Sequence, residues 1–257
     1  MGGAPTVTLL TDFGTADSYV AEMKGAMLRV APDARLVDVT HDVPAGDLAA
    51  GRYLLTRTWR QFPPGTVHLV VIDPGVGSAR PALAATRDDH GFVGPDNGVL
   101  GPVLPGATVV KLPVPAAAST TFHGRDVFGP AAARLAAGTP LEALGERFDD
   151  WMRGEIPLPR REGKWTFGEV IYVDRFGTLV TNIPADAAHG RGTVVVQRTG
   201  VPLRRTFSDV EPGALVAFIG SGGTVEIAAR DGSAAVALGV GVGTEVRIGD
   251  LKLAIGD

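Results

Sequence analysis

The segment TVHLVVIDPGVGSAR, residues 66–80, indicates most clearly which fold the first half of the chain adopts. Residues 66–72 are almost all apolar, which is typical of a strand in a sheet that is covered on both faces. The strand ends in Asp73, and one proline and two glycines follow before Arg80. The pattern therefore places a carboxylate at the carboxyl end of a buried strand, which is the edge of a parallel sheet where ligands bind.

Helical and strand patterns alternate on both sides of this segment. Apolar residues at helical spacing predict helices, and β-branched or apolar runs predict the strands between them. The predicted helices span 17–32, 47–62 and 126–138, and the predicted strands with their turns span 6–10, 34–42, 66–73, 81–89 and 91–100. This alternation indicates an α/β domain over residues 1–150, with a mostly parallel sheet and flanking helices.

The second half of the chain has a different pattern. Residues 151–165 are rich in proline, glycine and charge, and are predicted to form a linker. Residues 166–257 contain short strand-like runs separated by turn residues, which favours a smaller all-β barrel domain. These predicted strands include 201–207, 234–240 and 244–255.

The composition limits the classes of function. The net charge of −4 argues against a nucleic-acid partner, because binding a polyphosphate requires a strongly basic face. The absence of cysteine excludes disulfides, thiolate metal sites and cysteine nucleophiles. The N-terminus lacks the pattern of a signal peptide, and no apolar run reaches the roughly 18 residues of a membrane span. We therefore expect a cytoplasmic protein with no membrane partner.

Polar residues follow three of the predicted strands, at 11–12, at 40–42 and at Asp73. One acid at a strand end is usually a helix cap or a turn former. Three such ends in one sheet, together with GPDNG at 94–98 and FHGRD at 122–126, instead predict a ligand site at the carboxyl edge of the sheet.

Two features of these segments indicate side chains that could act on a ligand. His123 precedes a glycine and a predicted helix that Asp126 could cap, a position at which a side chain is aimed and not simply buried. Arg80 lies seven positions after Asp73, and the loop between them can fold back so that the two form a bidentate contact. Surface arginine and solvent-facing histidine are the simpler alternatives.

The same acids and histidines allow a second interpretation, a metal site with oxygen and imidazole ligands. No HxxxH, HExxH or HxD spacing supports it, and a GxSxG motif for a serine hydrolase is also absent. A metal-dependent phosphoesterase stays open as an alternative, although we expect no metal. The residues that this alternative would use are Asp12, His41, Asp42, Asp73, Asp96 and His123.

Six spaced motifs together carry a resemblance to a known family. They are TDFGTADSYVAEMKG (11–25), DVTHDVPAGD (38–47), VVIDPGVGSAR (70–80), GPDNG (94–98), FHGRDVFGPAAA (122–133) and DRFGTLVTNI (174–183). In this order they resemble the S-adenosyl-L-methionine (SAM) hydroxide adenosyltransferases, adenosine-forming SAM hydrolases that are related to the SAM-dependent fluorinases and chlorinases.

The resemblance implies an α/β domain joined to a β-barrel, and a homotrimer that binds SAM between domains of neighbouring subunits. It implies that water attacks C5′ of the ribose, giving adenosine and L-methionine, with SAM as the substrate and no cofactor. An acid at the position of Asp73, where the halogenating relatives have a non-acid, would repel halide and favour hydrolysis. A SAM-binding or adenosine-binding protein without activity is a further alternative.

The resemblance also implies roles for individual residues. The catalytic set falls on Asp73, Arg80 and His123. The expected substrate-binding residues are Asp12 for the ribose, Asp17 or Asp174 or both for the methionine ammonium, Phe176 for stacking on adenine, and Thr178, Asn182 and Ser221. Thr178 replaces the asparagine of the usual DRFGN motif, and Asn182 is the nearest amide that could take its place.

Overall fold

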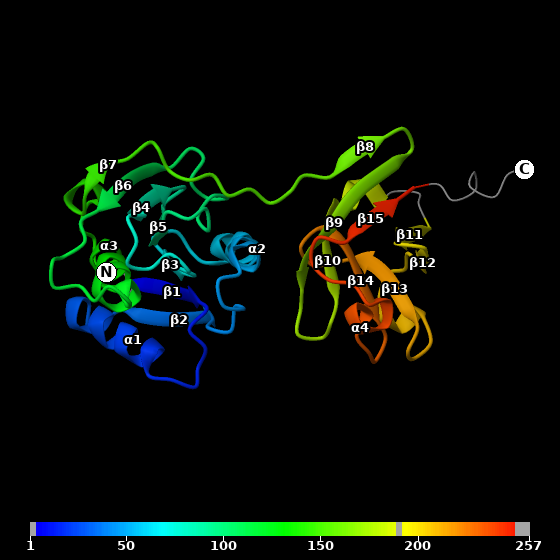
Figure 1. Cartoon of the computed structure of the whole chain (residues 1–257), viewed down its shortest axis with the longest axis horizontal. Helices are drawn as coiled ribbons and strands as arrows, with labels where there is room; N and C mark the ends of the chain where they lie inside the picture. Colours follow the sequence, from blue (N-terminus) through cyan, green and yellow to red (C-terminus); the bar gives the residue numbers. More distant parts are fainter. Residues whose placement is uncertain (1–3, 189–191, 250–257) are drawn as a thin grey trace, which may run out of the picture. The chain divides into compact units, whose positions relative to one another are not determined.

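The computed structural model describes residues 4–188 and 192–249, and the chain divides into two compact units, Met1–Glu155 and Ile156–Asp257 (Figure 1). The first unit is α/β and the second is almost entirely β, so the predicted fold class is confirmed. Within the described residues, no helix is both long enough and apolar enough to cross a membrane.

A seven-stranded sheet in the order β2-β1-β3-β5-β4-β6-β7 forms the centre of the first unit. Its parallel strands are β1 (Thr6–Thr11), β2 (Arg35–Thr40), β3 (Val67–Val71) and β5 (His90–Pro95), and β4 (Ala82–Arg87), β6 (Thr108–Leu112) and β7 (Glu146–Arg147) extend it in antiparallel fashion. The change of direction arises at Asp88 and Asp89, both with positive φ, because such a two-residue turn makes a tight hairpin between β4 and β5.

Helices cover both faces of this sheet, which explains why every residue of β3 is buried. The helices are α1 (Tyr19–Val30), α2 (Leu48–Thr58) and α3 (Gly129–Ala136), with short 3₁₀ turns at Trp59–Gln61 and Leu141–Ala143 and a π-helical turn at Gly124–Phe128. On one face, α1 and α3 pack against alternate residues of β1 and β3. On the other face, α2 approaches so closely that Gly51 leaves no room for a side chain beside Ile72.

The second unit is an antiparallel sheet in the order β12-β11-β15-β9-β10-β14-β13, with β8 beside β9. Its strands are β8 (Arg160–Glu162), β9 (Trp165–Val173), β10 (Leu179–Pro184), β11 (Thr193–Val196), β12 (Thr199–Pro202), β13 (Leu215–Ile219), β14 (Thr224–Ala229) and β15 (Glu245–Ile248), with 3₁₀ turns at Ala185–Ala188 and Phe207–Asp209. A bridge between Leu203 and Ala217 joins the two ends of this order, so the sheet is a nearly closed barrel around an apolar core.

Three of the predicted segments differ from the structure. Residues 234–240, predicted as a strand, contain helix α4 (Ala234–Leu238), because the Ser233 hydroxyl caps its first turn and Gly239 ends it with φ 64°. Part of the predicted linker is strand β8, which a two-residue turn at Gly163 and Lys164 folds back onto β9.

The predicted strand 201–207 is the third difference, because β12 ends at Pro202 and a 3₁₀ turn capped by Thr206 and Asp209 follows. The prediction for 244–255 holds for β15 over Glu245–Ile248, and residues 250–255 lie outside the described residues.

Candidate active site

The carboxyl ends of the parallel strands carry the polar residues that the sequence singled out. Asp12 follows β1, His41 follows β2, Asp73 lies two residues after β3 and Asp96 follows β5. These strands are parallel neighbours in the sheet, so their carboxyl ends lie along one edge. The expectation of a single polar edge is therefore met.

Asp73 and Arg80 form the predicted bidentate contact. Nε of Arg80 donates to Oδ1 of Asp73 at 2.9 Å, and Nη2 donates to Oδ2. The side chains of Arg80 and Asp73 are only 9% and 5% exposed. Because two parallel hydrogen bonds fix the plane of a carboxylate as well as its position, Asp73 is held in one orientation.

His123 joins this pair through the same guanidinium. Nη2 of Arg80 lies 3.0 Å from Nδ1 of His123, and since a guanidinium can only donate, Nδ1 must accept. The proton of the neutral ring then resides on Nε2. Burial, and next the charge of Arg80, lower the pKa of His123, so the ring is neutral near pH 7. Arg80 thus connects an ionised acid with a neutral imidazole.

The loop that carries Asp73 and Arg80 packs tightly against the segment that leads to His123. Gly77 has φ +77°, and a Cβ there would collide with the carbonyl oxygen of Thr120, so only glycine fits. The guanidinium of Arg80 also lies over the ring of Phe128 at 5.1 Å. The relative positions of the two segments are therefore fixed by packing as well as by hydrogen bonds.

Asp12 lies at the same edge of the sheet. Its Oδ2 accepts a hydrogen bond of 2.8 Å from the backbone N–H of Gly46. Burial raises the pKa of Asp12 above its ordinary value, and the nearby charge of Asp73 raises it further. Two carboxylates therefore face the same region, one held by a guanidinium and the other by a backbone amide.

A side-chain relay that is buried at Thr11 and His41 and exposed at Asp38 supports the start of the loop that carries Asp12. Oγ1 of Thr11 is 2.8 Å from Nδ1 of His41. On its other side, Nε2 of His41 lies 3.1 Å from Oδ1 of Asp38, close but poorly aligned for a hydrogen bond. Lys24 binds Asp38 at 2.7 Å. This relay connects α1 and β2 to the end of β1.

The GPDNG segment has a structural role in the same unit. Oδ1 of Asp96 accepts from the backbone N–H of Met152 at 2.7 Å, and Nδ2 of Asn97 donates to the carbonyl of Ile72 at 2.9 Å. Burial raises the pKa of Asp96. Among residues 4–188 and 192–249, no group of three or more histidine and acidic side chains is arranged to hold a metal ion.

The second unit contains a cavity of about 700 Å³ beside the DRFGT turn. Three predicted substrate-binding residues line it, Asp174, Phe176 and Thr178. Oδ1 of Asp174 accepts from the backbone N–H groups of Phe176 at 2.9 Å and Thr178 at 2.8 Å, so this acid shapes the turn. The ring of Phe176 is 68% exposed and is therefore accessible to a ligand.

Phe207 and Arg230 are among the residues lining this cavity that the sequence analysis did not single out. Phe207 is 44% exposed and packs on Phe218 with ring centroids 4.6 Å apart. Its signal in the sequence was a single aromatic residue in the polar segment RRTFSD, at the end of the predicted strand 201–207. A half-exposed aromatic side chain at such a place is often part of a binding surface.

Three other predicted residues take no part in the contacts described for these two clusters of side chains. Both polar atoms of Asn182 are used internally, because Oδ1 accepts from the N–H of Glu169 and Nδ2 donates to the carbonyl of Pro157. Ser221 is exposed and does not line the cavity. Asp17 is exposed and precedes α1 in the first unit.

Comparison with known proteins places this geometry in a family. Residues 7–145 match the N-terminal domain of the SAM hydroxide adenosyltransferases, and residues 168–247 match the C-terminal domain. A protein of Salinispora arenicola named (R)-S-adenosyl-L-methionine hydrolase is 40% identical, and the match covers 96% of this chain and 99% of the relative. A protein of the same name from Thermus thermophilus is 42% identical over 94% and 98% of the two chains.

A solved structure from Thermotoga maritima, described as an uncharacterized conserved protein, superposes with a TM-score of 0.88 at 36% identity, covering 94% of this chain and 99% of that one. A fluorinase of Nocardia brasiliensis is more distant, at 29% identity over 96% of this chain and 98% of the relative. With both of its domains matched, the chain belongs to the SAM hydroxide adenosyltransferase family.

Proposed function

We propose that this protein is an enzyme that hydrolyses SAM, releasing adenosine and L-methionine. The observation that carries the proposal is the contact of Arg80 with both Asp73 and His123, in a chain about 40% identical to proteins named SAM hydrolases. The sulfonium makes methionine a good leaving group, so the difficult part of the reaction is the nucleophile. Water has a pKa of about 15.7 and attacks poorly unless it is oriented and loses its proton.

The geometry suggests a role for each member of the set. Asp73 is fixed by Arg80 and accepts a hydrogen bond from the attacking water, taking its proton as the bond to C5′ forms. His123 directs Nδ1 to Arg80, which leaves Nε2–H to donate to the water oxygen and aim it. As the C5′–S bond breaks, its electron pair stays on sulfur, and the proton passes from Asp73 to solvent.

Asp73 also favours water over halide as the nucleophile. A buried carboxylate repels an anion, whereas a neutral water can donate to it. The site therefore suits hydrolysis better than the halogenation named for the more distant fluorinase relatives. We propose that SAM and water are the only reactants and that the enzyme needs no cofactor.

The binding of the substrate follows from the two clusters. Asp12 binds the ribose hydroxyls, and the 700 Å³ cavity takes the adenine between its exposed aromatic rings, with Thr178 at its side. Asp174 binds the methionine ammonium through the carboxylate oxygen that the turn does not use. The roles of Asp17, Asn182 and Ser221 stay predictions from the resemblance.

We further propose that the enzyme is a cytoplasmic homotrimer, as the family resemblance implies. Ribose-binding and adenine-binding residues lie in different units of the chain, and in a trimer neighbouring subunits can supply them to one site. Light scattering should give three times the chain mass of 26.6 kDa. A monomer with full activity would contradict this part of the proposal.

The experiment that tests the function is an incubation of the purified protein with SAM in H₂¹⁸O, with and without EDTA. We expect adenosine that carries ¹⁸O at its 5′-oxygen, together with an equal amount of methionine, at the same rate with the chelator. No adenosine would overturn hydrolysis and leave SAM binding alone. Loss of activity with EDTA would favour the metal-dependent alternative.

A further inference from the structure

We infer that Arg125, which does not contact the Asp73–Arg80–His123 set, is a positioning residue that fixes His123 against Arg80. The inference rests on the proposed role of His123 in hydrolysis. An arginine that is one-third exposed is usually a surface residue of little consequence. Arg125 differs from such a surface residue because its hydrogen bonds join the turn that follows His123 to helix α1.

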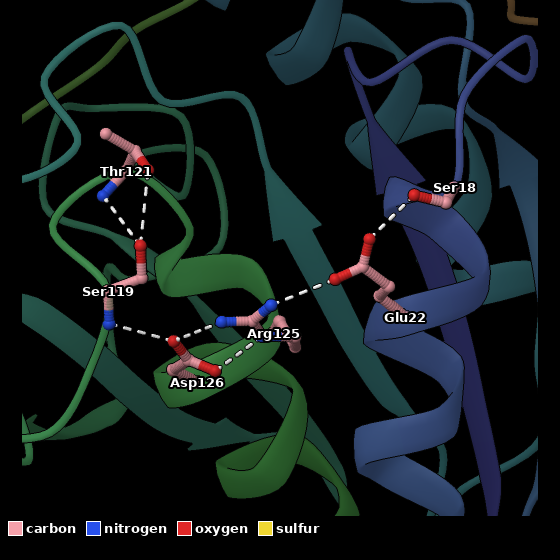
Figure 2. Close-up of polar contacts among 6 residues, drawn as sticks. All are labelled: Ser18, Glu22, Ser119, Thr121, Arg125 and Asp126. Atoms are coloured by element: carbon pink, nitrogen blue, oxygen red, sulfur yellow. Dashed lines mark hydrogen bonds and ion pairs between the residues drawn. The ribbon is translucent and has the colours of Figure 1, made fainter.

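Arg125 joins two elements that are far apart in the sequence (Figure 2). Its Nε and Nη2 donate to the two carboxylate oxygens of Asp126, at 2.7 and 3.0 Å. Its Nη1 donates to Oε2 of Glu22 on α1 at 2.9 Å. Glu22 is itself oriented by the hydroxyl of Ser18 at 2.7 Å. One side chain therefore fastens the π-helical turn after His123 to α1.

Asp126 also binds the loop that precedes His123. Its Oδ2 accepts from the backbone N–H of Ser119 at 2.8 Å, and Figure 2 shows the contact on the side of Asp126 away from Glu22. The hydroxyl of Ser119 in turn accepts from the backbone N–H of Thr121 at 3.3 Å. His123 lies between Ser119 and Asp126 in the chain, so this contact closes the segment that holds it.

The backbone around His123 needs such support. Gly124–Phe128 is a single π-helical turn, a rare conformation that neighbouring contacts must hold and that recurs at functional sites. Gly124 packs against the ring of Phe13, where a Cβ would lie 2.8 Å from the nearest ring atom. If the turn shifts, the 3.0 Å contact between Arg80 and His123 shifts with it.

The experiment compares three variants with one control in the full-length protein. Arg125→Gln removes both the charge and the fork, and Arg125→Lys keeps the charge but cannot fork onto Asp126 while it also binds Glu22. Glu22→Gln weakens only the anchor to α1. Arg147→Gln is the control, because Arg147 makes an exposed two-hydrogen-bond contact with Asp149 at β7, away from the site.

We expect Arg125→Gln to lower kcat about 10- to 100-fold with KM within about threefold, the size of effect that a misplacement of about 1 Å produces. Arg125→Lys should fall between this variant and the wild type, and Glu22→Gln should lose less. If Arg125→Gln keeps kcat within about twofold, or if Arg147→Gln loses as much, the inference is wrong. Should Arg125→Gln fail to fold, an unchanged kcat in Glu22→Gln would overturn the anchorage.

A pH profile separates positioning from a general loss of structure. The charged groups that act on His123 are Arg80, which lowers its pKa, and Asp73 and Asp126, which raise it. Without Arg125 the charge of Asp126 is less compensated, so the pKa of His123 should rise and the acid limb of kcat should move to higher pH. Arg125→Lys should leave that limb in place.

NMR of the His123 ring tests its position separately from its proposed role in hydrolysis. If His123→Ala retains full kcat, the proposed role of His123 fails whatever Arg125 does. Histidine-labelled protein studied by NMR still tests the position of the ring. We expect the His123 resonances and their titration to change in Arg125→Gln and not in Arg147→Gln, and unchanged resonances would overturn the inference.

Discussion

His123 and His68 are both buried imidazoles of the first unit, 6% and 1% exposed, and burial lowers the pKa of both. Their partners differ. Nδ1 of His123 accepts from Arg80, which also holds the carboxylate of Asp73. The difference between charged and neutral partners decides what each cluster can do.

His68 lies at the middle of the sheet among neutral groups. Its Nδ1 is 2.8 Å from the hydroxyl of Thr8, and its Nε2 is 3.1 Å from Nδ1 of His90. The rings of Phe62 and Phe92 pack around it. Because neither direct hydrogen-bond partner of His68 is charged, the core cluster of Thr8, His68 and His90 satisfies buried polar groups. The edge cluster of Asp73, Arg80 and His123 instead holds a charge ready to act on a ligand.

The largest expected effect belongs to the edge cluster. Asp73→Asn keeps the shape of the side chain but removes its charge and its capacity to take a proton. We expect kcat to fall about 10²- to 10⁴-fold, the usual contribution of general-base assistance, with SAM affinity within about tenfold. Steady-state kinetics and calorimetry check this. A variant that loses SAM binding and keeps kcat would make Asp73 a binding residue instead.

The core cluster should show the opposite behaviour. His68→Leu fills the space but leaves the hydroxyl of Thr8 and the ring of His90 without a partner. An unpaired buried polar group costs about 1–3 kcal/mol, so the free energy of unfolding should drop by roughly that amount for each group. Urea denaturation measures it, and kcat per folded molecule should be unchanged. A fall in kcat at constant stability would remove the contrast between the clusters.

The pH dependence of stability sharpens the same contrast. Burial lowers the pKa of His68 to about 3, against about 6.5 in the unfolded chain. Below pH 6.5 the unfolded state binds the extra proton, so the stability is fully present above that pH and is lost as the pH falls toward 3. Between pH 7 and pH 5 the loss should be about 2 kcal/mol, seen as faster hydrogen exchange of β3 amides. His68→Leu should lack this dependence, and an equal slope in that variant would contradict the assignment.

The contact of Asp73 with Arg80 could be predicted from the sequence because a six-residue loop rich in glycine and proline brings the two back together. The contact between His68 and His90 could not, because nothing in an apolar strand indicates which distant residue its one histidine meets. Local signals for α4 were present, a serine before and a glycine after AAVAL, but apolar residues over so short a segment fit a strand equally well. Strand β8 went unpredicted because its pairing, and not its composition, makes it a strand.

Thr11 and His41 share features of both clusters, so a variant of this pair tests whether it serves the site or only the stability of the fold. The expected effect on the kinetics is the smallest of those predicted here. They are buried like the core cluster, yet they lie at the edge beside Asp12. Thr11→Val keeps the shape but removes the hydroxyl that contacts Nδ1 of His41 and accepts from the N–H of Phe13, on the far side of Asp12. Because Asp12 lies between these two supports, its carboxylate should lose precision, and KM for SAM should rise by up to about tenfold while kcat stays near the wild-type value. Thr11→Ser retains the hydroxyl and should restore KM. A fall in kcat at constant KM would show that the pair acts in catalysis, as Asp73 does. A loss of stability alone would show that it only stabilises the fold, as His68 does.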